Sequence, residues 1–146
     1  MPVMELDMLI AFVNRADRLH KVAAEVFSRI AAGELRGVAV PASAYVEYEL
    51  VLRSRGYSEE VVRSDIEALR RVRNLGEVPL TSEVIVEASR LREAYGLTYF
   101  DSLHAASALL HDGVMISVDE AYRRVRGLRA LRPEEVLAPR QPRGRR

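Results

Sequence analysis

Residues Thr98 to Tyr122 read T-Y-F-D-S-L-H-A-A-S-A-L-L-H-D-G-V-M-I-S-V-D-E-A-Y and set the architecture of the chain. The first half predicts a helix of mainly small and apolar residues that carries an acid, Asp101, near its start, and Gly113 supplies the left-handed conformation that ends it. Residues 114–116 predict a short buried strand, and a second acid, Asp119, follows its end. Ligands of open parallel sheets bind outside the carboxyl ends of the strands. The hypothesis is therefore that the two carboxylates face one cleft.

The composition is that of one soluble globular domain. A chain of 146 residues is long enough for one core and too short for two domains. Hydrophobic residues make up 49% and charged residues 29%, an ordinary globular balance. There is no cysteine, so disulfides and thiolate metal sites are excluded, and a metal would bind carboxylate or imidazole. No apolar run approaches the roughly 18 residues of a membrane span and no signal peptide opens the chain, so we expect a cytoplasmic protein.

The net charge of +1 hides an uneven use of cations. Of 22 lysines and arginines, Lys21 is the only lysine. Arginine suits bidentate contacts to phosphate, but its excess also follows genome composition and thermophily. Residues 139–146 read P-R-Q-P-R-G-R-R, a composition typical of a disordered basic tail that adds at most loose attraction to nucleic acid. We therefore expect one domain over residues 1–138, followed by this tail.

The remaining segments predict an alternation of strands and helices. The predicted strands are residues 3–7, 37–41, 76–80 and 114–116, with 128–131 as a fifth strand at an edge. The predicted helices are residues 17–32, a helix capped by Ser43 and ended by Gly56, residues 58–74 with Ser58 at the cap, residues 81–95 with Thr81 at the cap, and the helix of Asp101. This order indicates a three-layer α/β/α sandwich around a central parallel sheet of four to five strands, with the first strand central.

Several nucleotide-binding and phosphoryl-transfer enzymes with α/β folds are excluded by motifs that the chain lacks. The glycine pattern of a Rossmann cofactor site and the Gly-Lys-Ser/Thr of a P-loop are both absent. A haloacid-dehalogenase phosphatase would need a second aspartate where Leu9 stands, and a response-regulator receiver would need a lysine late in the chain, where there is none. The acids that remain must therefore act without these motifs.

Four acids follow strands or begin helices in this prediction: Asp7, Glu47, Asp101 and Asp119. Carboxylate oxygens are the ligands that Mg²⁺ and Mn²⁺ prefer. Such ions orient a phosphodiester, lower the pKa of an attacking water and stabilise charge on the leaving oxygen. The set therefore suits hydrolysis of RNA or DNA without a nucleophilic side chain.

The sequence around these acids resembles the PIN domain family, in particular the VapC-type toxin ribonucleases of toxin–antitoxin pairs. Residues 96–106, G-L-T-Y-F-D-S-L-H-A-A, are similar to the family's G-L-x-x-x-D-A-L-x-A-A. Residues 117–122, S-V-D-E-A-Y, match its T/S-x-D-x-x-F/Y element. The family's second motif is a helix with one Glu nine residues before a glycine; measured from Gly56, this spacing selects Glu47 over Glu49. The resemblance covers nearly the whole chain.

The first motif departs from the family pattern. The family usually has Asp-Thr-Asn or Asp-Thr-Ser after a short strand, and this chain has Glu5-Leu6-Asp7. A gapless match places Glu5 on the family's Asp, whereas a shift by two places Asp7 there and leaves Met8 where a hydroxyl is expected. On a strand the two acids would share one face, so either could reach a metal. Asp7 is preferred because it lies closer to the expected strand end.

The resemblance implies an Mg²⁺- or Mn²⁺-dependent endoribonuclease whose products carry 5′-phosphate and 3′-hydroxyl ends. It also implies a homodimer and a small VapB-like antitoxin, a segment of which enters the cleft. The predicted catalytic residues are Asp7, Glu47, Asp101 and Asp119, and the predicted metal ligands are these four and Glu5. Two alternatives stay open: a PIN-type RNA-processing nuclease outside a toxin pair, and a degenerate PIN domain that binds RNA or a protein without cleaving.

Each of these acids also has a purely structural interpretation. Asp101 could be only a helix N-terminal acid, and Asp119 an N-cap for the residues that follow it. Glu47 could be solvated or salt-bridged, and Glu5 could be a simple salt-bridge partner.

Other polar and aromatic residues of this region are expected to have structural roles. His104 and His111 are two helical turns apart, could share a face, and are expected to be surface or hydrogen-bonded residues rather than ligands. Tyr95, Tyr99 and Phe100 are expected in core or dimer packing rather than as a base-stacking platform.

Overall fold

The computed structural model describes residues 2–138 and is built on five short parallel strands. They are Val3–Met4 (β1), Ala39–Pro41 (β2), Gly76–Val78 (β3), Val114–Ile116 (β4) and Arg129–Leu131 (β5). The sheet order is β3-β2-β1-β4-β5, so β1 is central and β5 is an edge strand, as predicted. The predicted α/β fold with a parallel sheet is thereby confirmed.

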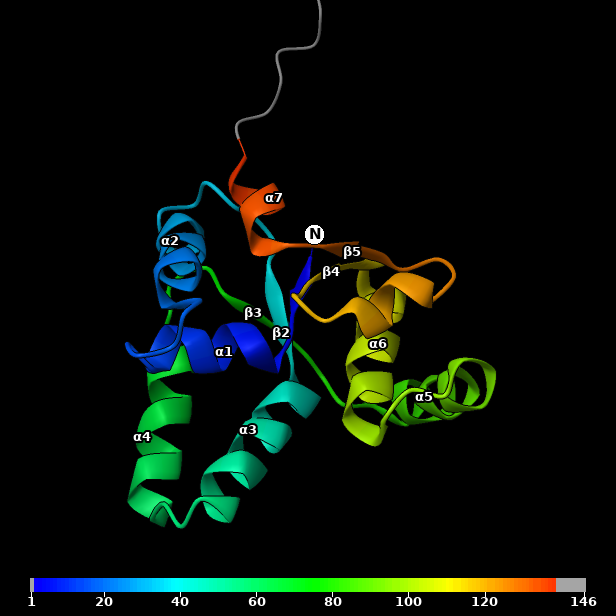
Figure 1. Ribbon diagram of the computed structural model, residues 1–146, viewed down its shortest axis with the longest axis horizontal. Coiled ribbons are helices and arrows are strands. Elements are labelled where there is room, and N and C mark those ends of the chain that lie inside the picture. Colours follow the sequence, from blue (N-terminus) through cyan, green and yellow to red (C-terminus); the bar gives the residue numbers. More distant parts are fainter. Residues whose placement is uncertain (1, 139–146) are drawn as a thin grey trace, which may run out of the picture.

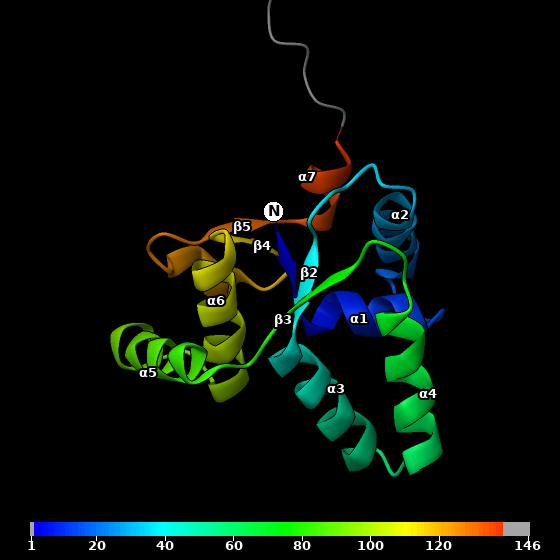
Figure 2. The ribbon, with the colours of Figure 1, turned by 180° about the vertical axis from the view of Figure 1, so that it is seen from behind.

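Helices cover both faces of this sheet. The first four are Leu6–Val13 (α1), His20–Ala31 (α2), Ala42–Ser54 (α3) and Glu59–Arg70 (α4). Figure 1 shows α1, α2 and α4 to the left of the strands and α3 below them. Ser82–Tyr95 (α5) and Tyr99–His111 (α6) lie on the other side, where the 3₁₀ helix Glu120–Arg124 (η1) joins them. A last helix, Pro133–Leu137 (α7), packs near α2. Figure 2 shows the same separation from behind.

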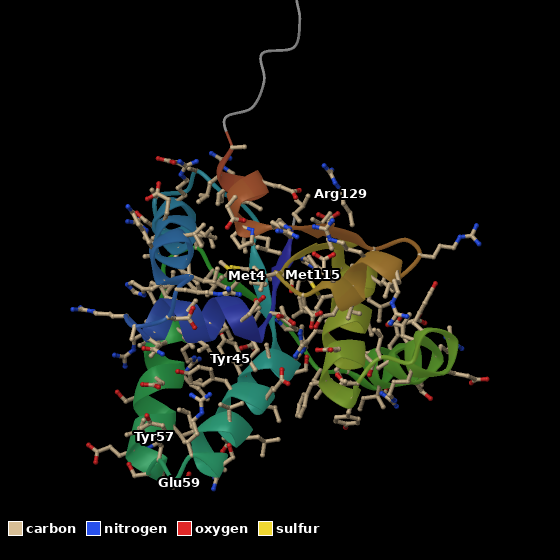
Figure 3. The ribbon with its side chains drawn as sticks, viewed as in Figure 1. Met4, Tyr45, Tyr57, Glu59, Met115 and Arg129 are labelled. Carbon is tan, nitrogen blue, oxygen red and sulfur yellow. The ribbon has the colours of Figure 1, made fainter. Side chains whose placement is uncertain are left out.

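Alternating strand residues divide the core between the two helical layers. Met4 and Ile116 are buried with α1 to α4, whereas Val3 and Met115 are buried with α5, α6 and η1. This is the two-residue period of a strand, applied to a sheet that is buried on both faces. Met4 and Met115 accordingly lie near the middle of the molecule (Figure 3).

The predicted first strand is too long. β1 ends at Met4, and Glu5 has an extended backbone as the N-terminal cap of α1, which begins at Leu6. The buried residues of α1, Met8, Leu9 and Ala11, have helical spacing, and their burial against α2 and α3 decides the conformation. The prediction that Glu5 and Asp7 share a strand face is therefore wrong. The reason for preferring Asp7 is also wrong, because Glu5 is the acid at the strand end.

The predicted capping role of Ser43 is wrong as well. α3 begins at Ala42 directly after Pro41, and no side chain caps it. Ser43 lies inside the first turn, is fully buried, and directs its hydroxyl to another helix. With Ser43 as the cap, the helix would begin at residue 44, so α3 begins two residues earlier than predicted, directly after the extended backbone of Pro41.

Other boundaries shift by a few residues. α2 begins at His20 rather than residue 17, because the Asp17 carboxylate accepts a hydrogen bond from the Leu19 amide at 2.8 Å and holds a turn there. α4 ends at Arg70 rather than 74; Asn74 has a positive φ of 67°, and its amide donates to the end of α2. The strands predicted as 37–41, 76–80 and 128–131 are each shorter than expected.

Several helix signals are confirmed. Ser58 and Thr81 accept hydrogen bonds from the amides of Val61 and Val84 and cap α4 and α5. Gly96 ends α5 in the left-handed conformation. α7 was not predicted, although a proline and two acids open it.

The predicted basic tail lies outside the described residues. No helix within residues 2–138 has the length and apolar character of a membrane span.

Candidate active site

Acidic side chains gather where β1 and β4 end. Glu5 follows β1, and residues 117–119 follow β4, its neighbour in the sheet. The carboxyl ends of β1 and β2 lead into α1 and α3, and α6 runs alongside them (Figure 1). Parallel strands thus bring residues distant in sequence to one sheet edge.

Two of the predicted acids meet on one tyrosine. The hydroxyl of Tyr122, which is fully buried, lies 2.5 Å from Glu5 Oε2 and 3.0 Å from Asp101 Oδ1. A phenol has one hydrogen, so it can donate to only one of the two carboxylates at a time. The second carboxylate needs a proton or a cation to stabilise its charge.

Asp7 lies beside this pair and is only half satisfied. Its Oδ2 accepts from the Val118 amide at 2.9 Å and from the Ser117 hydroxyl at 3.3 Å. Its other oxygen, Oδ1, is buried and has no hydrogen-bond partner. Such a buried carboxylate oxygen is unfavourable unless a cation binds it or the neighbouring Glu5 carboxyl, when protonated, donates to Asp7.

Burial and mutual repulsion shift the protonation of these acids. Burial raises the pKa of the Glu5 carboxyl well above its usual range, and the charges of Asp7 and Asp101 raise it further against the hydrogen bond from Tyr122. Burial also raises the pKa of Asp7, although the Val118 amide opposes this. Within residues 2–138, no lysine or arginine forms an ion pair with Glu5, Asp7 or Asp101. This cluster of acids is therefore rich in negative charge and poor in cations.

Glu47 reaches the same region from α3. Its Oε1 lies 2.8 Å from Nε2 of His104, which is located one helical turn after Asp101 on α6. The side chain of Glu47 is about 23% exposed. Glu47 is thus hydrogen-bonded to a residue of α6 while remaining partly accessible to solvent.

Asp119 was predicted to be a helix N-cap, a metal ligand or both, and the structure shows the N-cap. Its Oδ1 accepts from the Ala121 amide at 2.9 Å and caps η1, and its residue is exposed. Ser117 connects it to Asp7, since the Ser117 hydroxyl contacts Asp7 and also accepts from the Asp119 amide at 3.0 Å. A cap uses one carboxylate oxygen, so ligation by Asp119 remains a prediction.

The residues present fit a hard divalent cation, though not as a finished cage. Within residues 2–138, no three Asp, Glu or His side chains stand in ready-made metal geometry. Mg²⁺ does not need such a cage, because it keeps several waters and binds through one or two carboxylates. The unpartnered Asp7 oxygen, and the two carboxylates that share one phenol hydrogen, supply oxygen donors and uncompensated charge.

A hollow in the surface lies away from these acids. Its volume is about 630 Å³, and its lining includes Pro2, Val38 and Val114, which precede or begin strands, with Arg36 at the rim. It therefore lies at the amino ends of the strands and contains none of the clustered carboxylates. Shape alone does not locate the chemistry in this protein.

The sequence did not predict the hydrogen-bond partners of four residues at the site: Tyr122, Ser117, His104 and Ser43. Tyr122 and Ser117 belong to the motif quoted around Asp119, where a residue type is visible but a partner is not. His104 was expected to be a satisfied polar residue, and its two hydrogen bonds confirm this. The helical spacing of three residues from Asp101 was the one signal for its position.

Of the expectations for the other polar and aromatic residues, some are confirmed and some are wrong. His104 is buried and His111 exposed, so they do not share an environment. Phe100 is partly buried against the core of α5 and α6, as expected. Tyr99 is 60% exposed, with the Arg92 guanidinium 5.3 Å from its ring centre, so the expectation of core packing is wrong for Tyr99.

Comparisons with known proteins agree with this fold. A model of the PIN domain matches residues 7–128. The VapBC2 complex of Rickettsia felis, solved with promoter DNA, superimposes with a TM-score of 0.69 at 14% identity, covering 89% of this chain and 96% of that chain. Mycobacterium tuberculosis VapC20, described as a sarcin-ricin loop cleaving toxin, gives 0.65 at 14% identity over 82% and 91%. A toxin–antitoxin complex from Klebsiella pneumoniae gives 0.64 at 13% identity over 91% and 98%.

At these identities the solved structures show a shared fold and no more. No match is found among curated proteins. The family model, in contrast, covers most of the sequence, including Asp7, Glu47, Asp101 and Asp119. The chain belongs to the PIN domain family.

Proposed function

We propose that this protein is a metal-dependent endoribonuclease that acts as the toxin of a toxin–antitoxin pair. One observation carries the proposal: Glu5, Asp7 and Asp101 come together at the sheet edge, a single phenol hydrogen lies between two of them, and no lysine or arginine in the described part of the chain forms an ion pair with any of the three. An acidic cluster without basic residues suits a cation that in turn holds a phosphodiester.

Glu5, Asp7 and Asp101 are the residues that would hold Mg²⁺ or Mn²⁺, with Glu47 and Asp119 at the margin. When bound, the ion supplies positive charge for the phosphate and lowers the pKa of a bound water. Tyr122 keeps Glu5 and Asp101 at a fixed separation, and the Val118 amide fixes Asp7. The resemblance to the family implies that water attacks phosphorus and that the 3′ oxygen leaves and takes up a proton, which gives 5′-phosphate and 3′-hydroxyl ends.

The toxin role is supported by the neighbours in structure, since two of them are toxin–antitoxin complexes. We extend to this chain a small VapB-like antitoxin partner and a homodimer. A PIN nuclease that processes RNA outside a toxin pair remains the alternative, and the neighbouring gene separates the two.

A second function in another class is a degenerate PIN domain that binds RNA or a protein without cleaving. The absence of a ready-made three-ligand group among the described residues favours it, as does the departure of Glu5-Leu6-Asp7 from the family's usual first motif. Metal binding without turnover would support this alternative.

The test is cleavage of a labelled mixed-sequence RNA with Mg²⁺ or Mn²⁺, with EDTA as one control. Asp101→Asn should abolish cutting. Asp65→Asn is the matched control, because Asp65 also accepts a tyrosine hydroxyl, from Tyr48 at 2.8 Å, but on α4. Cutting that survives EDTA or Asp101→Asn would falsify the proposal, and comparing Glu5→Gln with Asp7→Asn then identifies the first-motif acid.

A further inference from the structure

A chain of three polar side chains, two of them fully buried, connects α3 to α6 one helical turn from Asp101. His104 has no exposed surface; its Nδ1 lies 2.8 Å from Ser43 Oγ and its Nε2 lies 2.8 Å from Glu47 Oε1. Ser43 is also fully buried, so packing fixes this partner of the imidazole. Ser43 and Glu47 are one turn apart on α3 and face the same ring.

The direction of these hydrogen bonds follows from the chemistry of Glu47. An ionised carboxylate only accepts, so Nε2 of His104 carries a hydrogen whether the ring is neutral or charged. In the neutral ring Nδ1 is then an acceptor, and the Ser43 hydroxyl donates to it. Ser43 thus holds the tautomer and the plane of the imidazole, and the imidazole holds one oxygen of Glu47.

The second oxygen of Glu47, Oε2, has no hydrogen bond among the described residues, and the side chain is partly open to solvent. His104 lies three residues after Asp101, so one face of α6 presents both the Asp101 carboxylate and the group that orients Glu47. A hydrogen bond to one oxygen of a flexible glutamate already restricts its rotamers, so less conformational entropy is lost when the other oxygen binds an ion.

We propose that His104 is a positioning residue for the metal site: it fixes Glu47 so that Oε2 is available as a ligand, and Ser43 fixes His104. This rests on the proposed metal role of Glu47. His104 does not touch the substrate or the ion itself.

Two substitutions separate the contacts of the ring. His104→Gln places an amide near the position of Nε2 and keeps a donor to Glu47, whereas His104→Asn reaches only the position of Nδ1, near Ser43. Each variant loses one buried hydrogen bond, so both should unfold at similarly lowered temperatures. Ser107→Ala is the matched control: Ser107 is buried on the same helix and bonds only to the Leu103 carbonyl, at 2.8 Å.

The measurement is the affinity for Mn²⁺ alone, by titration calorimetry or by the electron spin resonance of free Mn²⁺. His104→Asn should weaken binding roughly 10- to 100-fold, the range found for orienting residues of metal ligands. His104→Gln and Ser107→Ala should stay within about threefold of wild type. In a Glu47→Gln background, which is itself weakened, His104→Asn should have no further effect, because its effect passes through the carboxylate.

Other results would overturn the inference. The inference fails if the wild-type protein does not bind Mn²⁺ or if His104→Asn binds Mn²⁺ with wild-type affinity. It also fails if both His104 variants lose affinity in proportion to their lowered unfolding temperatures, or if His104→Asn lowers the affinity equally in the wild-type and Glu47→Gln backgrounds. RNA cleavage is read separately. Cleavage by wild type with no effect of His104→Asn on affinity rejects this inference and keeps the nuclease; binding that depends on His104, without cleavage of any RNA, supports this inference and rejects the nuclease.

Discussion

At the scale of single residues, the carboxylates of the site have fewer hydrogen-bond donors than they have oxygens to accept them. Glu5 and Asp101 compete for the Tyr122 hydroxyl, and one oxygen of Asp7 has no donor. Sequence reasoning found the acids because carboxylates after strands and at helix starts have recognisable positions. It could not find their partners, because Ser43 and His104 are 61 residues apart and only the packing of α3 against α6 joins them.

The first residue-scale prediction concerns Glu5→Gln in metal-free protein. The pKa of Glu5 is raised in the folded state, so its ionised form is destabilising: wild-type stability falls as pH rises from the unfolded pKa, about 4.3, through the folded pKa, and stays reduced above it. Each unit of upward shift costs about 1.4 kcal/mol at high pH. In EDTA, Glu5→Gln should therefore unfold at a higher temperature than wild type at pH 7.5, and the gap should shrink towards pH 4.

The measurement is thermal unfolding in EDTA across this pH range. Glu83→Gln is the control, because Glu83 is exposed in the first turn of α5. A Glu5→Gln protein less stable than wild type at pH 7.5 would show that the carboxylate is stabilising, contrary to this reasoning.

The second residue-scale prediction is the effect of Tyr122→Phe. The change removes the only hydrogen between two carboxylates at a buried position, which should lower the free energy of unfolding by about 1.5–3 kcal/mol, the range for hydrogen bonds to charged groups. Tyr48→Phe is a matched control, since Tyr48 donates to the single, partly buried Asp65. Urea unfolding should show a larger loss for Tyr122; equal losses would mean that the bridge between two acids adds nothing.

At the scale of elements, local signals were reliable where one residue decides a boundary. The caps Ser58 and Thr81 and the end of α5 at Gly96 were all readable. The first strand was predicted too long because the acids and apolar residues up to Asp7 alternate as they would on a strand. Only the burial of Met8 and Leu9 against α2 and α3 shows that a helix begins there. α3 likewise begins early because its start is set by Pro41 and by the buried contact of Ser43, not by a cap.

The prediction at this scale compares two glycines. Gly96 has φ of 66° and an added Cβ would meet nothing within 4 Å, so Gly96→Ala tests backbone strain alone and should cost about 1–2 kcal/mol. Gly76, in β3, does not have a positive φ, and an added Cβ would make ordinary contact with Ala39 at 3.5 Å. Gly76→Ala should therefore be close to neutral in urea unfolding. Similar losses for both would mean that the positive φ of Gly96 does not account for the cost of replacing it.

At the scale of the whole molecule, the acidic cluster joins the two helical layers. Glu5 and Asp7 belong to the connection from β1 to α1, whereas Asp101 and Tyr122 belong to α6 and η1 on the opposite side of the sheet. An ion held by acids from both layers would bind the folded chain and not the unfolded one. Metal binding should therefore stabilise the molecule as a unit.

We expect Mn²⁺ at about 100 times its dissociation constant to raise the free energy of unfolding by about 2.7 kcal/mol. Asp101→Asn should lose most of this gain, because it removes the ligand from the α6 side, whereas Asp65→Asn on α4 should keep it. The measurement is the unfolding temperature of the three proteins over a range of Mn²⁺ concentrations, with Ca²⁺ as a second ion. An equal shift in Asp101→Asn and Asp65→Asn would mean that the ion binds elsewhere on the surface, and the carboxylates at the sheet edge would then need another explanation for their unbalanced charge.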